Sequence, residues 1–208
     1  YKNFALNAKE IKMNLTPDFI LHIGAGKCGS SAIQRAILDG EAILNQNGIS
    51  VAKEKFPDGN MEFGNLVSTL HNLMQLGKNN VTEFLYNLKY SNPRKSILIS
   101  AENLSNLGNH IYFKEIAKQF TIKCIFYVRR QDEYLESSWV QWGSKIYNSF
   151  HRWVEGQLES SARWDLIWED WSSVVGAENV EVRIYDRNTF ENRDIVNDFN
   201  KAIFSATG

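Results

Sequence analysis

The residues with the clearest chemical potential form a glycine-rich stretch at positions 22–31, with the sequence HIGAGKCGSS. The stretch follows an apolar run and precedes an amphipathic pattern, so we expect it to join a strand to a helix. Glycines let backbone N–H groups converge in such a loop, and the helix N-terminus adds the positive end of its dipole. Lys27 adds a positive charge inside the loop. The stretch therefore predicts an anion-binding site.

Two known nucleotide-binding patterns fit this stretch only in part. The NTPase pattern G-x-x-x-x-G-K-[ST] has its glycine spacing at Gly24 and Gly29, but Ser30 stands where the lysine is required. The dinucleotide pattern G-x-G-x-x-G fits Gly24, Gly26 and Gly29, yet the next strand end, at 52–54, lacks a well-placed carboxylate for the ribose. A tight turn with an incidental lysine is the structural alternative.

Apolar runs alternate with helical patterns along the chain, which is typical of strands linked by crossover helices. The sequence therefore predicts an α/β fold with a mostly parallel sheet of about five strands flanked by helices. The expected strands are 19–23, 49–52, 96–100, 122–129 and 180–185. Helical patterns cover 30–44, with Gly40 as a weak point, and 66–76, 81–90 and 131–145. Spacings of four and three residues predict one buried helix face for Trp164, Trp168 and Trp171.

Composition narrows the class of protein. The chain has 208 residues, 43% of them hydrophobic, which suits one packed domain over 1–208, and no repeat or flexible linker divides it. The net charge of -1 provides no general basic field for nucleic acid, so we expect no nucleic-acid partner. The apolar runs are far shorter than the roughly 20 residues that span a bilayer, so no transmembrane segment is expected.

Cysteine usage points to a reducing compartment. Cys28 and Cys124 are the only cysteines, and neither lies in a CxxC pair or near a histidine at metal-ligand spacing. A disulfide scaffold or zinc module is therefore not expected, and we predict a cytoplasmic protein. The sequence begins with Tyr1 rather than methionine, which fits a processed form or a fragment.

The glycine-rich stretch resembles the 5'-phosphosulfate loop of sulfotransferases that use 3'-phosphoadenosine 5'-phosphosulfate (PAPS), with lysine three residues before paired hydroxyls. The resemblance implies a P-loop-like parallel sheet and PAPS as co-substrate, with no metal. It assigns the backbone amides of 26–31 to the 5'-phosphosulfate. The residues that it implies for this contact are Gly26, Lys27, Cys28, Gly29, Ser30 and Ser31.

A second resemblance lies about 100 residues further along. An arginine that closes a strand, with a serine eight residues later, resembles the 3'-phosphate motif of the same family. Arg129 and Ser137 fit this motif, and Arg130 and Ser138 have the same spacing. The position directly after Val128 favours the first pair. Weaker resemblance to bacterial carbohydrate-type sulfotransferases continues through SFHRWVEGQL, RWDLIWEDWSSVVG and VEVRIYDR to IVNDF.

The resemblance also suggests chemical roles. Lys27 is expected to donate to the bridging oxygen as it becomes a phosphate oxygen, which neutralises the charge of the leaving group. An acceptor hydroxyl also loses a proton, and Glu102 is the best-placed general base because it follows the predicted strand 96–100. His71 and Glu62 are the alternatives, and a capping or surface carboxylate is the structural interpretation of Glu102.

We expect an acceptor hydroxyl on a glycan, a glycolipid head group or a small alcohol. The competing hypothesis is a P-loop nucleotide-binding or kinase-like protein without sulfotransferase activity. Enzymes of the resembled family commonly continue into a further segment that helps to enclose the nucleotide and the acceptor, whereas this sequence ends soon after Phe204. We therefore expect truncation at the C-terminus.

Overall fold

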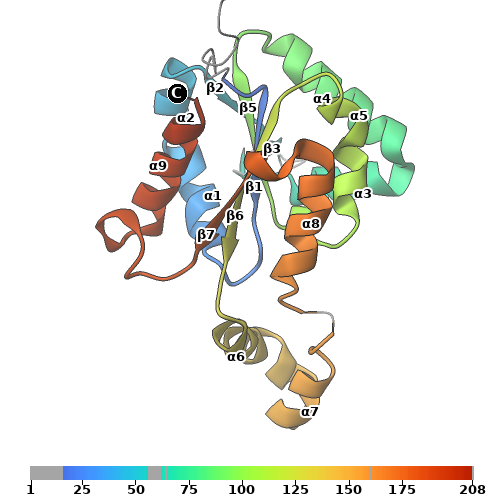
Figure 1. The fold of residues 1–208 in the computed structure, drawn as a ribbon, viewed down its shortest axis with the longest axis vertical. Coiled ribbons are helices and arrows are strands. Elements are labelled where there is room, and N and C mark those ends of the chain that lie inside the picture. The colour runs from blue at the N-terminus through green and yellow to red at the C-terminus, as the bar shows by residue number, and fades with distance from the viewer. Residues whose placement is uncertain (1–15, 56–61, 64, 160, 208) are drawn as a thin grey trace, which may run out of the picture.

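The computed structural model describes residues 16–55, 62–63, 65–159 and 161–207. A five-stranded, all-parallel sheet forms the centre of the molecule, with strand order β2-β5-β1-β6-β7 (Figure 1). The strands are β1 (Phe19–Ile23), β2 (Ile49–Val51), β5 (Ser96–Ala101), β6 (Ile122–Val128) and β7 (Val180–Ile184). The predicted α/β class and all five predicted strands are confirmed.

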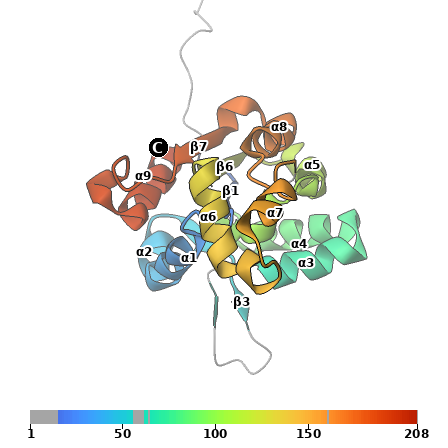
Figure 2. The same cartoon turned by 90° about the horizontal axis from the view of Figure 1, so that it is seen from below.

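Helices cover both faces of this sheet. In Figures 1 and 2, α1, α2 and α9 lie on one side and α3, α4, α5 and α8 on the other. Every residue of β1 and β5 is buried, because a parallel sheet between two helical layers exposes neither face. The helices are α1 (Ser30–Asp39), α2 (Glu41–Gln46), α3 (Val67–Leu76), α4 (Lys78–Ser91), α5 (Lys114–Ala117), α6 (Gln131–Gln141), α7 (Phe150–Glu155), α8 (Trp164–Val175) and α9 (Ile195–Thr207).

Short elements complete the described chain. A two-stranded antiparallel ladder, separate from the main sheet, joins β3 (Glu54–Lys55) and β4 (Glu62–Phe63). The 3-10 helices are η1 (Glu102–Ser105), η2 (Asn109–Phe113), η3 (Gly143–Lys145), η4 (Ala177–Asn179) and η5 (Glu191–Arg193). In the described ranges, no helix is both long enough and apolar enough to span a membrane.

Three sequence expectations need correction. The pattern at 30–44 forms two helices that separate at Gly40, and the helix expected over 131–145 ends at Gln141, where a 3-10 turn follows. Trp171 is buried as predicted, but Trp168 on the same helix is 38% exposed. Its position three residues before Trp171 places it at the margin of the buried face, where the sheet does not cover it.

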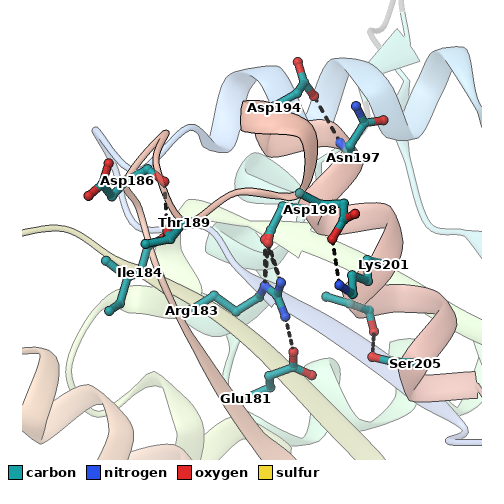
Figure 3. A network of polar contacts seen from close by, with 12 residues as sticks. Glu181, Arg183, Ile184, Asp186, Thr189, Asp194, Asn197, Asp198, Lys201 and Ser205 are labelled. Atoms are coloured by element: carbon teal, nitrogen blue, oxygen red, sulfur yellow. Dashed lines mark hydrogen bonds and ion pairs between the residues drawn. The ribbon is translucent and has the colours of Figure 1, made fainter.

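A charged cluster fastens α9 to the edge strand β7 (Figure 3). Arg183 donates to both carboxylate oxygens of the buried Asp198, through Nε at 3.1 Å to each oxygen, and to Glu181 Oε1 at 2.5 Å. These hydrogen bonds, above all those to Asp198, raise the pKa of Arg183. Two carboxylates thus compensate the partly buried guanidinium. The cluster fixes the position of α9, which packs beside α1.

Candidate functional site

The carboxyl ends of the three central strands bring the predicted site residues to one edge of the sheet. Ile23 of β1 lies beside Ala101 of β5 and Phe126 of β6 in the parallel ladders. The glycine-rich loop, Glu102 and Arg129 directly follow these strands. Open parallel sheets bind ligands at this edge.

The loop is shaped by two residues with left-handed backbone conformation. Lys27 has φ +62° and Gly29 has φ +79°. A Cβ atom on Gly29 would collide with Ile195 Cδ1 and lie 2.7 Å from Tyr185 Cε2, so only glycine fits both the conformation and the space. Helix α1 begins at the next residue without a side-chain cap, which leaves its first N–H groups available to an anion.

The ammonium group of Lys27 lies at the mouth of the loop, against the end of α6. Lys27 Nζ donates to Gln141 Oε1 at 2.6 Å and lies 6.0 Å from the centroid of the Trp142 ring. The same ring is near Gly26, where an added Cβ would lie 3.5 Å from Trp142 Cη2. Gln141 and Trp142 therefore form one wall of the site.

A hydrogen bond joins the side chains of Ser30 and Glu102. The buried Ser30 Oγ donates to Glu102 Oε1 at 2.8 Å, so the carboxylate belongs to the loop environment. Ser31, one residue later on α1, is exposed. Of the alternative bases, His71 is exposed on α3, and the side chain of Glu62 in β4 lies outside the described part of the chain.

The two arginines of the second motif have different environments. Arg129 Nη1 donates to the carbonyl oxygen of Lys27 at 3.4 Å, and its guanidinium lies 5.5 Å from the centroid of the Tyr185 ring. Its Nε also donates to Glu133 at 3.2 Å. The Arg130 side chain is 73% exposed and pairs with Asp132. Proximity to the loop thus favours Arg129 over its neighbour.

The two candidate serines lie side by side on α6. Ser138 is 3% exposed, and Ser137 is half-buried. Burial makes Ser138 the less accessible to a ligand in this conformation, which agrees with the preference for Arg129 and Ser137. The choice between the two serines remains a prediction.

Two side chains of the glycine-rich stretch, those of His22 and Cys28, are buried. His22 Nδ1 lies 2.8 Å from Ser100 Oγ in a hydrogen bond, and burial lowers the pKa of His22 to about 3. The histidine is therefore neutral at physiological pH, as expected for a hydrogen-bonded structural residue. Cys28 is 1% exposed, and burial raises the pKa of its thiol to about 12.

Cys28 is expected to resist alkylation in the folded protein. At pH 8 the raised pKa lowers the thiolate population on the order of 10³-fold relative to an ordinary cysteine, and the thiolate is the reactive form. Mass spectrometry after brief iodoacetamide treatment should find Cys28 unmodified, and treatment in urea should modify it. Rapid labelling of the native protein would contradict this assignment.

A cavity of about 310 Å³ lies beside the loop. Its walls come from the loop, from the segment after β5, and from α6 and the start of α8. The lining residues are Ala25, Gly26, Ser105, Asn106, Leu107, Tyr134, Ser161, Ala162, Arg163, Trp164 and Ile167. Sequence reasoning missed this cavity and the role of Gln141, because neither has a local pattern, whereas the position of Trp142 after Ser137 on the same predicted helix does suggest a place near the nucleotide site.

Comparison with known proteins agrees with the fold. A crystal structure of a sulfotransferase from Alicyclobacillus acidocaldarius superposes with a TM-score of 0.55 at 15% sequence identity, covering 90% of this chain and 81% of that chain. The fold is sulfotransferase-like. No family model and no curated protein matches the sequence. At this identity the similarity concerns the fold, and activity has to be argued from the site.

Proposed function

We propose that this protein is a sulfotransferase that transfers a sulfuryl group from PAPS to an acceptor hydroxyl. The observation that carries the proposal is the contact between the two predicted nucleotide-binding motifs. Arg129 donates to the backbone oxygen of Lys27, so the arginine and the glycine-rich loop adjoin at the carboxyl edge of the sheet. A single nucleotide with phosphate groups on the 3' and 5' positions of its ribose could contact both the arginine and the loop.

The donors in the loop suit a phosphosulfate. The uncapped amides at the start of α1 and the ammonium of Lys27 supply positive potential without a metal ion. In the described part of the chain, no group of three or more His, Cys, Asp or Glu residues could hold a metal ion. Lys27 must leave Gln141 to reach the bridging oxygen, where its charge stabilises the leaving phosphate.

The proposed reaction moves one sulfuryl group from PAPS to the acceptor oxygen. The bond between sulfur and the bridging oxygen breaks, a bond between sulfur and the acceptor oxygen forms, and adenosine 3',5'-bisphosphate leaves. Glu102 takes the proton of the acceptor hydroxyl. Ser30 has a single hydroxyl proton, which it donates to Glu102 in this structure. If Ser30 donated it to the bound phosphosulfate instead, the oxygen of Glu102 would be free to take the proton of the acceptor hydroxyl.

The acceptor is proposed to be a glycan, a glycolipid head group or a small alcohol. The cavity beside Gly26 supports an uncharged acceptor, because its polar lining comes largely from hydroxyl and amide groups such as Ser105, Asn106 and Ser161. Its one arginine, Arg163, is paired with Asp165 through two hydrogen bonds.

Thermal denaturation tests the nucleotide preference. Adenosine 3',5'-bisphosphate should raise the melting temperature, because a ligand at 100 times its Kd adds about 2.7 kcal/mol to the free energy of unfolding. ATP and NAD at the same concentration should have smaller effects. A larger shift with ATP and magnesium, and none with the bisphosphate, would instead indicate the nucleotide-binding or kinase-like alternative.

Arg129→Met should weaken binding of PAPS at least tenfold and leave adenosine 5'-phosphosulfate nearly unaffected. Charge-assisted hydrogen bonds contribute about 1.5–3 kcal/mol each, and the second nucleotide lacks the 3'-phosphate. Calorimetric titration of both nucleotides measures the ratio of affinities. Arg130→Met is the matched control, because that side chain is exposed and paired with Asp132.

The ratio of the two nucleotide affinities distinguishes a role of Arg129 in recognising the 3'-phosphate from a role in stabilising the fold. Arg129 also pairs with Glu133, so its loss could destabilise α6 without any role in binding. In that case the variant would lose stability while both affinities fell together. An unchanged ratio in both arginine variants would exclude the proposed 3'-phosphate site.

A further inference from the structure

The segment 137–154 projects from the carboxyl edge of the sheet and carries an unusual share of exposed apolar side chains. It comprises the second half of α6, η3 and most of α7, which lie apart from the other helices in Figure 1. We call it the projecting segment. Five of its large hydrophobic side chains are between 41% and 78% exposed: Val140, Trp142, Ile146, Tyr147 and Phe150.

This exposure does not reflect a loose structure, because the projecting segment has a small aromatic core. The Trp139 ring packs against Phe150 and Trp153, with centroid distances of 5.5 and 5.8 Å. A Cβ atom on Gly143 would lie 2.6 Å from Trp139 Cε3, so the turn after α6 is closely packed. The exposed side chains are therefore presented by a defined scaffold. Exposed apolar side chains gathered in one short, well-packed segment commonly mark an interaction site.

The charge of the projecting segment is also distinctive. The protein as a whole has a net charge of -1, yet no aspartate or glutamate occurs between Glu136 and Glu155. Lys145 and Arg152 are exposed, and neither has an ion-pair partner among the described residues. The segment thus combines aromatic and aliphatic surface with unpaired positive charge.

We propose that the projecting segment docks on an anionic lipid bilayer. Tryptophan and tyrosine favour the boundary between head groups and acyl chains, aliphatic side chains bury their surface just below it, and lysine and arginine are attracted to lipid phosphates. No acidic residue lies within the segment, so its charge complements the negative surface potential of an anionic bilayer.

The position of this surface connects it to the candidate site. Gln141 and Trp142 belong to the projecting segment and contact Lys27. Docking would therefore bring the bilayer surface close to the loop. If the proposed function is correct, a head-group hydroxyl of a lipid could reach the loop without leaving the membrane. The docking itself does not depend on that function.

Vesicle co-sedimentation of the full chain tests the proposal. Vesicles that contain phosphatidylglycerol should bind the protein, vesicles of phosphatidylcholine alone should bind it much less, and salt should weaken the difference. The double variant Ile146→Asn/Tyr147→Asn should bind at least tenfold more weakly. Lys145→Gln should reduce binding to the anionic vesicles about fivefold. Ile43→Asn/Leu76→Asn is the matched control, since both side chains are exposed apolar residues on other helices.

Two results would overturn the proposal. One is absent binding to anionic vesicles, or binding that neither the double variant nor Lys145→Gln alters. The other is a concentration-dependent dimer in analytical ultracentrifugation that the double variant abolishes, without vesicle binding, because the surface would then fit a second copy of the chain. Neither measurement involves sulfuryl transfer, so a negative result here would not contradict the proposed function, which the nucleotide-binding and turnover measurements test separately.

Discussion

Replacing Lys27 with alanine should lower turnover about 10²–10³-fold while changing the affinity for adenosine 3',5'-bisphosphate by less than tenfold. The ammonium group is expected to act on the bridging oxygen as negative charge develops there, so its contribution is larger in the transition state than in the complex with product. Steady-state kinetics and calorimetric titration of the same preparation measure the two effects. Alanine tolerates the φ of +62° about as well as lysine, so the loop should keep its shape.

Lys118→Ala is a suitable control, because that exposed lysine precedes the amino end of β6, whereas the candidate site lies at the carboxyl end of the strand. It should leave both quantities unchanged. Equal losses of turnover and bisphosphate affinity in Lys27→Ala would remove Lys27 from the chemical step and leave it a role in binding.

Glu102→Gln should lower turnover by about 10²–10⁴-fold with the nucleotide site intact. Glutamine keeps the size of the side chain, and its carbonyl oxygen can still accept the hydrogen bond from Ser30, but it cannot take a proton from the acceptor. Turnover with a confirmed acceptor and titration with the bisphosphate measure the two effects.

The pH profile of kcat/KM distinguishes a base from a positioning residue. A base that must be ionised makes kcat/KM fall at low pH, and this acidic limb should be missing in Glu102→Gln. Ser30→Ala removes the hydrogen bond but keeps the carboxylate, so the limb should persist. Glu83→Gln, on an exposed carboxylate of α4, serves as the unaffected control. Unchanged turnover in Glu102→Gln would transfer the role to His71, Glu62 or water.

Much of the fold could be predicted because its strands are local apolar patterns. The runs around Leu21 and Leu98 are buried on both faces, and such burial leaves a nearly continuous apolar signature. The helix expected to reach Lys145 instead ends at Gln141, because tertiary packing of Gly143 against two tryptophans determines that turn. Local periodicity does not contain that information.

The candidate site was predictable to a similar extent. Strand ends and helix starts indicated that the loop, Glu102 and Arg129 share one edge, and the ladders place them there. The hydrogen bond from Ser30 to Glu102 and the contact between Lys27 and Gln141 were not predictable. Both depend on how separate elements meet in space, and no spacing along the chain reports this.

The close packing of Gly29 against Tyr185 and Ile195 has a consequence for biosynthesis. The glycine-rich loop leaves the ribosome well before β7 and α9, which adjoin it and follow it by more than 140 residues. Its left-handed turn is therefore supported only after the Arg183 cluster has fastened α9 to the sheet edge. The nascent chain can collapse around β1 and β5 first, and competence to bind nucleotide should appear only after α9 has been translated.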